Sequence, residues 1–286
     1  MGWFDRPMVA LIRRLTAEDI PACAEVSDSI GWGRRMGSWH YMIALGGEGA
    51  LAMVVDGRVA ATAFGLIYSE ALAWIGTVIT DRAHQGKGYA RQLMVALMDY
   101  LRGAGVQSVM LDATEFGQPL YASLGFRPLY RVNIYGATQE FNLTQAPARP
   151  YRAEHLPQIV ALDHALMGVE RPAVLAEMAE RGWVRLDQAG DRVAGYCLAQ
   201  GDEALMHLGP WWDESPAGAE LLLQTALASM PGTGIRINVP LPHAEAVALV
   251  ERNGLFCLRG CTRMVWGEAP PGNMTAQYGI ASYGTG

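Results

Sequence analysis

The sequence predicts an α/β protein that consists of two similar modules, and three observations support this prediction. First, 286 residues suit two domains, and a hydrophobic content of 51% is enough to form buried cores. Second, short apolar stretches with strand-like alternation occur beside longer stretches in which apolar residues recur every three or four positions. Third, the second half of the chain repeats several short motifs of the first half.

The internal repeat consists of five short matches in the same order. Ala17–Pro21 recurs as Ala153–Pro157, which is 136 residues later. We therefore expect two modules, residues 1–145 and 150–286, with a linker near Gln145–Pro150, where two prolines stand among small residues. The other matching pairs, at spacings of 129 to 134 residues, are Arg58–Ala60 and Arg192–Ala194, Gly76 and Gly209, Gly125–Phe126 and Gly254–Leu255, and Tyr135–Gly136 and Trp266–Gly267.

Local patterns in the first module predict alternating strands and helices. Asp56-Gly57 between two alternating stretches indicates a two-residue hairpin turn. Apolar residues recur at spacings of three and four up to Gly103, which predicts a long helix that ends there. The expected elements are a short strand at Arg13-Arg14, a helix capped by Thr16, strands at 51–55, 58–66 and 73–80, a helix at 88–103, a strand at 107–113, a helix at 118–124 and a strand at 127–134.

Residues 59–79 are nearly all apolar, and this run has about the length of a membrane-spanning helix, roughly 20 residues. However, Ser69 and Glu70 lie in its middle, and β-branched and aromatic residues dominate both halves. This pattern predicts two buried strands joined by a turn at Tyr68–Glu70.

The composition excludes several classes of function. The net charge is −6, with 22 Lys and Arg against 28 Asp and Glu, so no basic face for nucleic acid is expected. The four cysteines lack metal-binding spacing, and the N-terminus lacks an apolar signal segment. We therefore expect a cytoplasmic protein, a monomer or homodimer, with no metal and with no nucleic-acid or membrane partner.

The junction between the strand at 73–80 and the helix at 88–103 is rich in glycine. A helix N-terminus leaves backbone N–H groups unpaired and carries a positive partial charge. Gly86, Gly88 and Ala90 would let a phosphate approach these groups, and Lys87 adds positive charge. This pattern indicates a diphosphate-binding turn, although a glycine-rich turn that only starts a helix would look the same. The segment matches neither the Walker loop nor the dinucleotide-binding fingerprint.

The same segment resembles the signature Q/R-x-x-G-x-G/A of the GNAT superfamily of acyl-CoA-dependent N-acetyltransferases. Residues 85–90, Gln-Gly-Lys-Gly-Tyr-Ala, match it at every fixed position, and Leu120-Tyr121 and Gly125-Phe126 follow at the family's spacing. The resemblance covers residues 11–136. The second half is similar to a degenerate GNAT-like module that follows such domains in some bacterial acetyltransferases. The implied fold is a pair of tandem modules, each with a mixed, mostly antiparallel twisted sheet flanked by helices.

The resemblance implies that acetyl-CoA is the cosubstrate and assigns residues to it. Tyr121 falls at the position that protonates the departing thiolate in many family members; the alternative is a packed aromatic residue. The positions implied to bind the cosubstrate are Val78, Ile79 and Thr80 for the pantetheine arm, and Gln85, Gly86, Lys87, Gly88, Tyr89, Ala90 and Arg91 for the diphosphate.

The general base is not identified by the sequence. Many family members carry a Glu on the strand before the phosphate turn, and the strand at 73–80 has none. Asp112 and Glu115 are candidates, together with Glu70, but ordered water is the favoured route for the amine's proton.

The acceptor site has two aromatic candidates. Trp32 and Trp39 lie where the family keeps a mobile acceptor-binding loop, which makes them candidate substrate-binding residues. For Trp39, core packing is an equal alternative.

The second module is not expected to hold a second active site. Asp213 stands where the first module has Gln85, and Pro216 where it has Gly88; both changes oppose anion binding. The helix that corresponds to that of Tyr121 has no tyrosine. Trp211-Trp212 could line an acceptor pocket, although buried packing is the alternative. The tail from Ala269 to Gly286 is expected either to fray or to pack over the other module.

The expected activity is acetyl-CoA-dependent N-acetylation of a primary amine on a small molecule, by direct attack in a ternary complex. The alternatives are a non-catalytic acetyl-CoA sensor and a protein lysine or N-terminal acetyltransferase.

Overall fold

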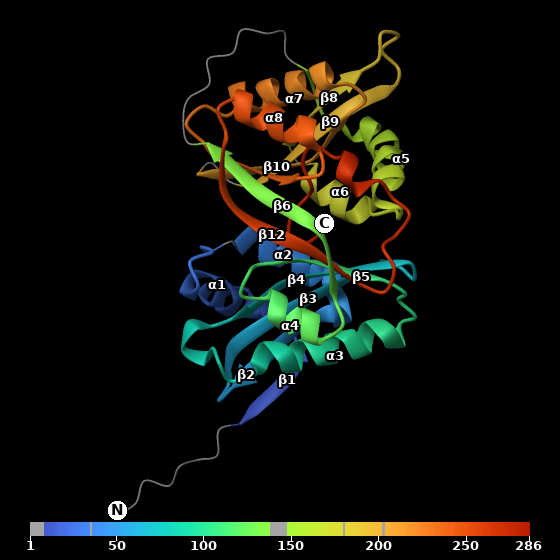
Figure 1. The fold of residues 1–286 in the computed structure, drawn as a ribbon. Helices are drawn as coiled ribbons and strands as arrows, with labels where there is room; N and C mark the ends of the chain where they lie inside the picture. Colours follow the sequence, from blue (N-terminus) through green and yellow to red (C-terminus); the bar gives the residue numbers. More distant parts are fainter. Residues whose placement is uncertain (1–8, 35, 138–147, 180, 202–203) are drawn as a thin grey trace, which may run out of the picture. The chain divides into compact units, whose positions relative to one another are not determined.

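The computed structural model describes residues 9–34, 36–137, 148–179, 181–201 and 204–286. The chain forms two compact units, residues 1–107 and residues 108–286, and each contains strands and helices (Figure 1). The predicted α/β class is therefore confirmed. The two compact units meet at the start of β5. Residues 145–147 of the proposed linker lie outside the described residues, and the bounds of the two sequence modules stay a prediction.

Within the described part of the first unit, four antiparallel strands follow the order β1-β2-β3-β4. Asp56 and Gly57 join β2 to β3 with φ angles of 48° and 82°, the left-handed geometry that a two-residue hairpin turn requires. The apolar run at 59–79 forms two strands, as predicted, and no helix of the described residues is long and apolar enough to cross a membrane. The strands are β1 (Ala10–Arg14), β2 (Ala50–Val55), β3 (Arg58–Ser69) and β4 (Leu72–Thr80).

The long helix α3 (Tyr89–Gly103) packs directly on this sheet. Its predicted apolar face, which includes Leu93 and Leu97, is fully buried. At Gly65 on β3 an added Cβ would lie only 2.6 Å from Leu97 Cδ1, so the glycine lets the helix approach the strand closely. The remaining helical elements are η1 (Ala17–Asp19), α1 (Ile20–Ser29), α2 (Met36–Gly46), η2 (Gly47–Gly49) and η3 (Arg82–His84).

The described residues of the second unit form eight strands in the order β5-β12-β6-β11-β10-β9-β8-β7. All neighbouring pairs are antiparallel except β10 and β11, which are parallel. The strands are β5 (Val109–Ala113), β6 (Arg127–Ala137), β7 (Arg149–Pro150), β8 (Arg181–Leu186), β9 (Val193–Gly201), β10 (Leu205–Asp213), β11 (Gly234–Pro240) and β12 (Phe256–Trp266).

The two sequence repeats exchange their last strands within this unit. Residues 262–266 of β12, the last strand of the second repeat, pair with β5 of the first repeat. Conversely, residues 132–137 of β6, the last strand of the first repeat, pair with β11 of the second. Because of this exchange, β5 and β6 of the first repeat belong to the same compact unit as the second repeat. The sequence contained no signal for it.

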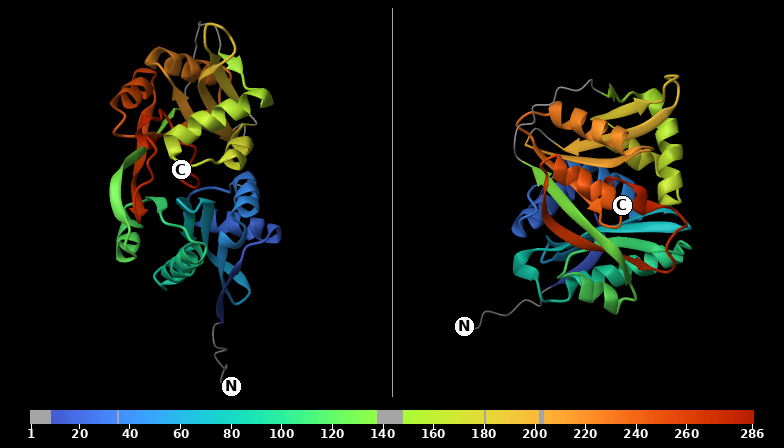
Figure 2. Two further views of the ribbon diagram at one scale, coloured as in Figure 1. Left: turned by 90° about the vertical axis from the view of Figure 1, so that its right-hand side faces the viewer. Right: turned by 45° about the horizontal axis from the view of Figure 1, so that its top comes forward.

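Helices cover both faces of the strands β8–β11. Cys197 on β9 belongs to a core that includes the buried faces of α7 and α8, which lie together on one side (Figure 2). The next residue along, Tyr196, points to the opposite face and donates a hydrogen bond to Asp163 on α5. The helical elements of this unit are α4 (Gln118–Ser123), η4 (Ala153–His155), α5 (Leu156–Met167), α6 (Pro172–Met178), α7 (Pro216–Ala228), α8 (Ala244–Arg252) and η5 (Met274–Ala276).

The C-terminal segment is part of this core. Gln277, Ile280 and Ala281 are fully buried, and Tyr278 is nearly so. Of the two expectations for the tail, fraying is therefore wrong, because these residues pack within the second repeat's own strands.

Candidate functional site

The predicted phosphate turn lies between β4 and α3 and is open to solvent. Gly86 and Gly88 have φ angles of 76° and 78°, which only glycine adopts without strain, and both have open space where a Cβ would stand. Gly86, Lys87 and Gly88 are exposed. Both glycines therefore stand at positions where the positive φ of the backbone favours glycine.

The first turn of α3 has unused hydrogen-bond donors. The bond from Gln92 N to Gly88 O, at 3.1 Å, is the first of the helix. The N–H groups of Gly88, Tyr89 and Ala90 donate to no residue in the described part of the chain. No side chain caps α3 at Gly88. Three free donors, a helix dipole and an adjacent lysine make this turn a candidate anion-binding site.

The turn is held in place by contacts on its N-terminal side. The Asp81 carboxylate accepts a hydrogen bond from Ala83 N at 2.9 Å and lies 3.4 Å from His84 Nδ1. Gln85 Nε2 donates to Thr80 O at 3.3 Å, so the first residue of the signature ties the turn back to the end of β4. This hydrogen bond of Gln85 helps to fix the conformation of the turn.

The strand β4 is irregular just before the residues expected to hold the pantetheine arm. Thr77 has a φ of 47°, which is strained for a β-branched residue and costs about 1–3 kcal/mol. The pairing with β3 shifts register there, between Gly76 and Ile79. The Thr77 hydroxyl is buried and has no hydrogen-bond partner among the described residues. Thr77 is thus a further candidate site residue that the sequence analysis missed, because a bulge inside an apolar strand leaves no local signature.

Tyr121 lies on α4, in the second unit, in a closely packed position. It is 8% exposed, and its ring meets that of Phe126 edge-on at a centroid distance of 6.1 Å. Gly117 makes room for it, since an added Cβ would lie 2.8 Å from Tyr121 Cε2. Its hydroxyl makes no hydrogen bond with the described residues. Burial, reinforced by Cys261, raises the pKa of Tyr121 well above its usual value, so the hydroxyl keeps its proton.

The two candidate bases have very different surroundings. The Asp112 carboxylate forms a bidentate ion pair with Arg263 at 3.0 and 2.8 Å, and both side chains are fully buried. This pairing commits both of its oxygens and does not favour a role as a base. Glu115, in the loop after β5, is exposed and unpaired among the described residues.

The two tryptophans proposed for acceptor binding also differ. Trp39 on α2 is 2% exposed, and its Nε1 donates to Ser27 Oγ at 3.3 Å. It therefore packs in the core of the first unit, which was the alternative interpretation. Trp32 is 36% exposed and lies between Gly31 and Gly33, whose φ angles are 82° and 75°.

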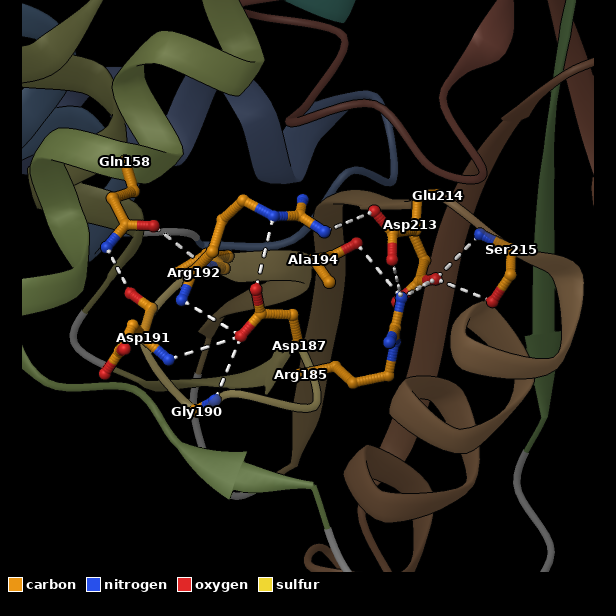
Figure 3. Close-up of polar contacts among 11 residues, drawn as sticks. Gln158, Arg185, Asp187, Gly190, Asp191, Arg192, Ala194, Asp213, Glu214 and Ser215 are labelled. Atoms are coloured by element: carbon orange, nitrogen blue, oxygen red, sulfur yellow. Dashed lines mark hydrogen bonds and ion pairs between the residues drawn. The ribbon is translucent and has the colours of Figure 1, made fainter.

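In the second repeat, the position that corresponds to the phosphate turn is occupied by side chains (Figure 3). Arg185 donates to the two Asp213 oxygens at 2.6 and 2.7 Å, and Asp213 Oδ1 also accepts from Ser215 N at 2.8 Å. The Ser215 hydroxyl in turn accepts from Gly218 N at 3.1 Å and caps α7. A buried carboxylate thus lies at the start of this helix, where an added anion would be repelled.

The two repeats also correspond at α4 and α8. Phe126 N donates to Tyr121 O at 3.1 Å, and the bond from Leu255 N to Val250 O has nearly the same length, 3.0 Å. Val250 therefore stands at the position of Tyr121 and is fully buried. The second repeat offers no proton donor there.

Comparisons with known proteins identify the family. The model of the acetyltransferase (GNAT) family matches residues 16–126, and the model of the acetyltransferase (GNAT) domain matches residues 159–279. The chain therefore belongs to the GNAT acetyltransferases and carries two GNAT modules. No curated protein matches the sequence.

Solved structures share this architecture over the whole chain. A Pyrococcus horikoshii protein matches with a TM-score of 0.84 at 21% identity, covering 100% of this chain and 98% of the other. A GCN5-related N-acetyltransferase from Sphaerobacter thermophilus matches with a TM-score of 0.66 at 15% identity, covering 92% and 96%. A tandem GNAT protein from the clavulanic acid biosynthesis pathway matches with a TM-score of 0.65 at 10% identity, covering 96% and 100%. At these identities, the likeness concerns the fold.

Proposed function

We propose that the protein is an acetyl-CoA-dependent N-acetyltransferase that acetylates a primary amine of a small molecule. The observation that carries this proposal is the set of unused N–H donors at Gly88, Tyr89 and Ala90, next to Lys87 and the left-handed Gly88. This donor set fits the diphosphate of coenzyme A, since backbone amides at a helix N-terminus bind phosphate oxygens well. Gln85 stabilises the turn through its hydrogen bond to Thr80 O, and the backbone of Val78–Thr80 would hold the pantetheine arm.

Bound acetyl-CoA supplies a thioester, whose acyl group passes to the amine nitrogen while the coenzyme leaves as a thiol. In this proposal Tyr121 provides the proton for the departing sulfur. The hydroxyl stays protonated because burial of Tyr121 raises its pKa, and it makes no competing hydrogen bond with the described residues. The tyrosine regains its proton from solvent after each turnover.

The amine must lose one proton to become nucleophilic. We do not place this role on Asp112, because both of its oxygens are bound by Arg263. Ordered water remains the proposed acceptor of this proton. Between Asp112 and Glu115, the side-chain alternative is Glu115, which is exposed and unpaired among the described residues.

The test is release of free thiol from acetyl-CoA by the full chain across a panel of amines. The panel holds amino acids, polyamines, aminoglycosides and a lysine-containing peptide, and mass spectrometry identifies any acetylated product. Release with a small amine, above the rate without acceptor, supports the proposal. Release with the peptide alone would instead indicate a protein acetyltransferase. Tight binding of acetyl-CoA without release for any amine would indicate a sensor and overturn the proposal.

A further inference from the structure

The strands β10 and β11 in the second repeat separate halfway along their length. They pair in parallel from Leu205 and Gly234 up to Leu208 and Ile237, and the pairing ends there. Beyond this point β10 continues beside β9, and β11 continues beside β6. The backbone edges of Trp211 on β10 and Asn238 on β11 are therefore left facing a gap between diverging strands.

The C-terminal segment fills this gap as an additional short strand. Trp211 N donates to Gly279 O at 2.8 Å, and Tyr278 N donates back to Trp211 O at 2.9 Å. On the other side, Ile280 N donates to Asn238 O at 2.9 Å. Both bridges are antiparallel. The segment thus satisfies backbone groups of both diverging strands, which would otherwise be buried without partners.

The fit between the segment and the gap is close. The Tyr278 ring contacts both Trp211, at a centroid distance of 5.0 Å, and His243, at 4.5 Å. Gly279 packs against Ile237, where an added Cβ would lie 2.9 Å from Cγ2. At Gly209 on β10 an added Cβ would clash with Ile280 O. The segment therefore packs closely against both β10 and β11.

The gap has a counterpart in the first module. Trp211 follows Val78 by 133 residues, the same spacing that separates Gly209 from Gly76. Val78 is one of the residues proposed to hold the pantetheine arm in the first module. The gap in the second module therefore corresponds to the slot for that arm. Two residues after Trp211, the Asp213 carboxylate and Arg185 close the position of the diphosphate (Figure 3).

We propose that Gln277–Ala281 is a built-in occupant of the second module's cosubstrate slot. The slot binds an extended peptide, with an aromatic side chain at position 278, in place of a thioester carrier. This module then binds residues 277–281 of its own chain, and the chain binds acyl-CoA in the first module alone. The correspondence between the gap and the pantetheine slot rests on the proposed function of the first module. The hydrogen bonds that hold Gln277–Ala281 in the gap do not depend on that function.

Hydrogen exchange of the full chain, read by mass spectrometry, tests this proposal. Without ligand, the amides of Tyr278, Gly279 and Ile280 are expected to exchange at least about 100-fold more slowly than unprotected amides. Saturating coenzyme A is expected to leave these rates unchanged. Unprotected rates, or rates that coenzyme A increases, would overturn the proposal, because the segment would then be loose or displaceable.

A variant pair makes the test specific. Gly209→Ala places a Cβ against Ile280 O and is expected to speed exchange at 278–280 at least about tenfold. Gly232→Ala is the control, since Gly232 also has a positive φ, 75°, but has open space around its Cβ position. Equal exchange at 278–280 in both variants would contradict the fit described above. If Gly209→Ala fails to fold, hydrogen exchange of the unaltered chain still tests the proposal. Failure of the transferase assignment would leave this ligand-free protection unchanged, so the two failures can be told apart.

Discussion

Arg263 on β12 and Asp112 on β5 form a buried bidentate ion pair between residues 151 positions apart in the chain. Arg263 Nη1 also donates to Tyr130 on β6 at 3.2 Å. The pair therefore connects the inserted strand of the second repeat to both of its neighbours from the first repeat. It lies where the two repeats exchange strands.

Removing one member of this pair is expected to destabilise the protein strongly. Arg263→Met leaves the Asp112 carboxylate buried without its partner, and breaking such a pair costs about 3–5 kcal/mol. Urea unfolding measures the change in free energy. The control is Arg14→Met, which breaks a single exposed pair, with Glu48, and is expected to cost below about 1 kcal/mol. Equal costs for the two variants would show that the buried pair does not secure the exchanged strand.

Gly88→Pro is expected to abolish acetyl-CoA binding. Proline removes the N–H donor and cannot adopt the φ of 78° that this position requires. Calorimetric titration should give one acetyl-CoA per unaltered chain and none for the variant. Gly105→Pro is a matched control, because Gly105 has the same φ, 78°, at the other end of α3. Unchanged affinity in Gly88→Pro, or two acetyl-CoA per unaltered chain, would contradict the proposed site.

Tyr121→Phe is expected to lower kcat by about 10²–10⁴-fold, the usual contribution of a general acid. The affinity for coenzyme A should not change, because the lost hydroxyl contributes only to the chemical step. Tyr135→Phe is the control, since it removes a different hydroxyl from the same unit, one that donates to Glu251. A kcat near that of the control would mean that Tyr121 serves packing alone.

The pH profile should reflect the raised pKa of Tyr121. A general acid must be protonated to act, so its activity is lost as the pH rises through its pKa. Burial moves the pKa of Tyr121 above the usual value of about 10, and kcat should therefore not fall through loss of this proton between pH 7 and 10. Stopped measurements of thiol release across this range provide the check. A decline below pH 10 that Tyr121→Phe abolishes would be inconsistent with the buried hydroxyl.

The local patterns were reliable where a few neighbouring residues decide the conformation. Asp56-Gly57 predicted a hairpin because both positions need left-handed φ angles, and the structure has them. The spacing of Leu93 and Leu97 predicted α3, whose apolar face is buried. The glycines of the phosphate turn were likewise visible, because a positive φ favours glycine whatever the surroundings.

Other features depend on residues far apart in the chain. Nothing near Asp112 indicates that Arg263 will neutralise it, so the sequence alone left Asp112 open as a base. From the sequence, Trp39 could equally bind an acceptor or pack in the core, and only its burial and its hydrogen bond to Ser27 show that it packs in the core. In the same way, Thr77 is strained only because the pairing with β3 shifts beside it.

The amino-acid sequence by itself determined the α/β class, the tandem repeat, the family and the glycine-rich turn before α3, since each rests on short-range spacing or backbone preference. Only the tertiary structure decided which repeat completes which set of strands, where Asp112 is neutralised and what fills the gap between β10 and β11. The reason is that these outcomes are set by burial and by backbone hydrogen bonds between distant segments. Such pairings leave no periodic trace along the chain.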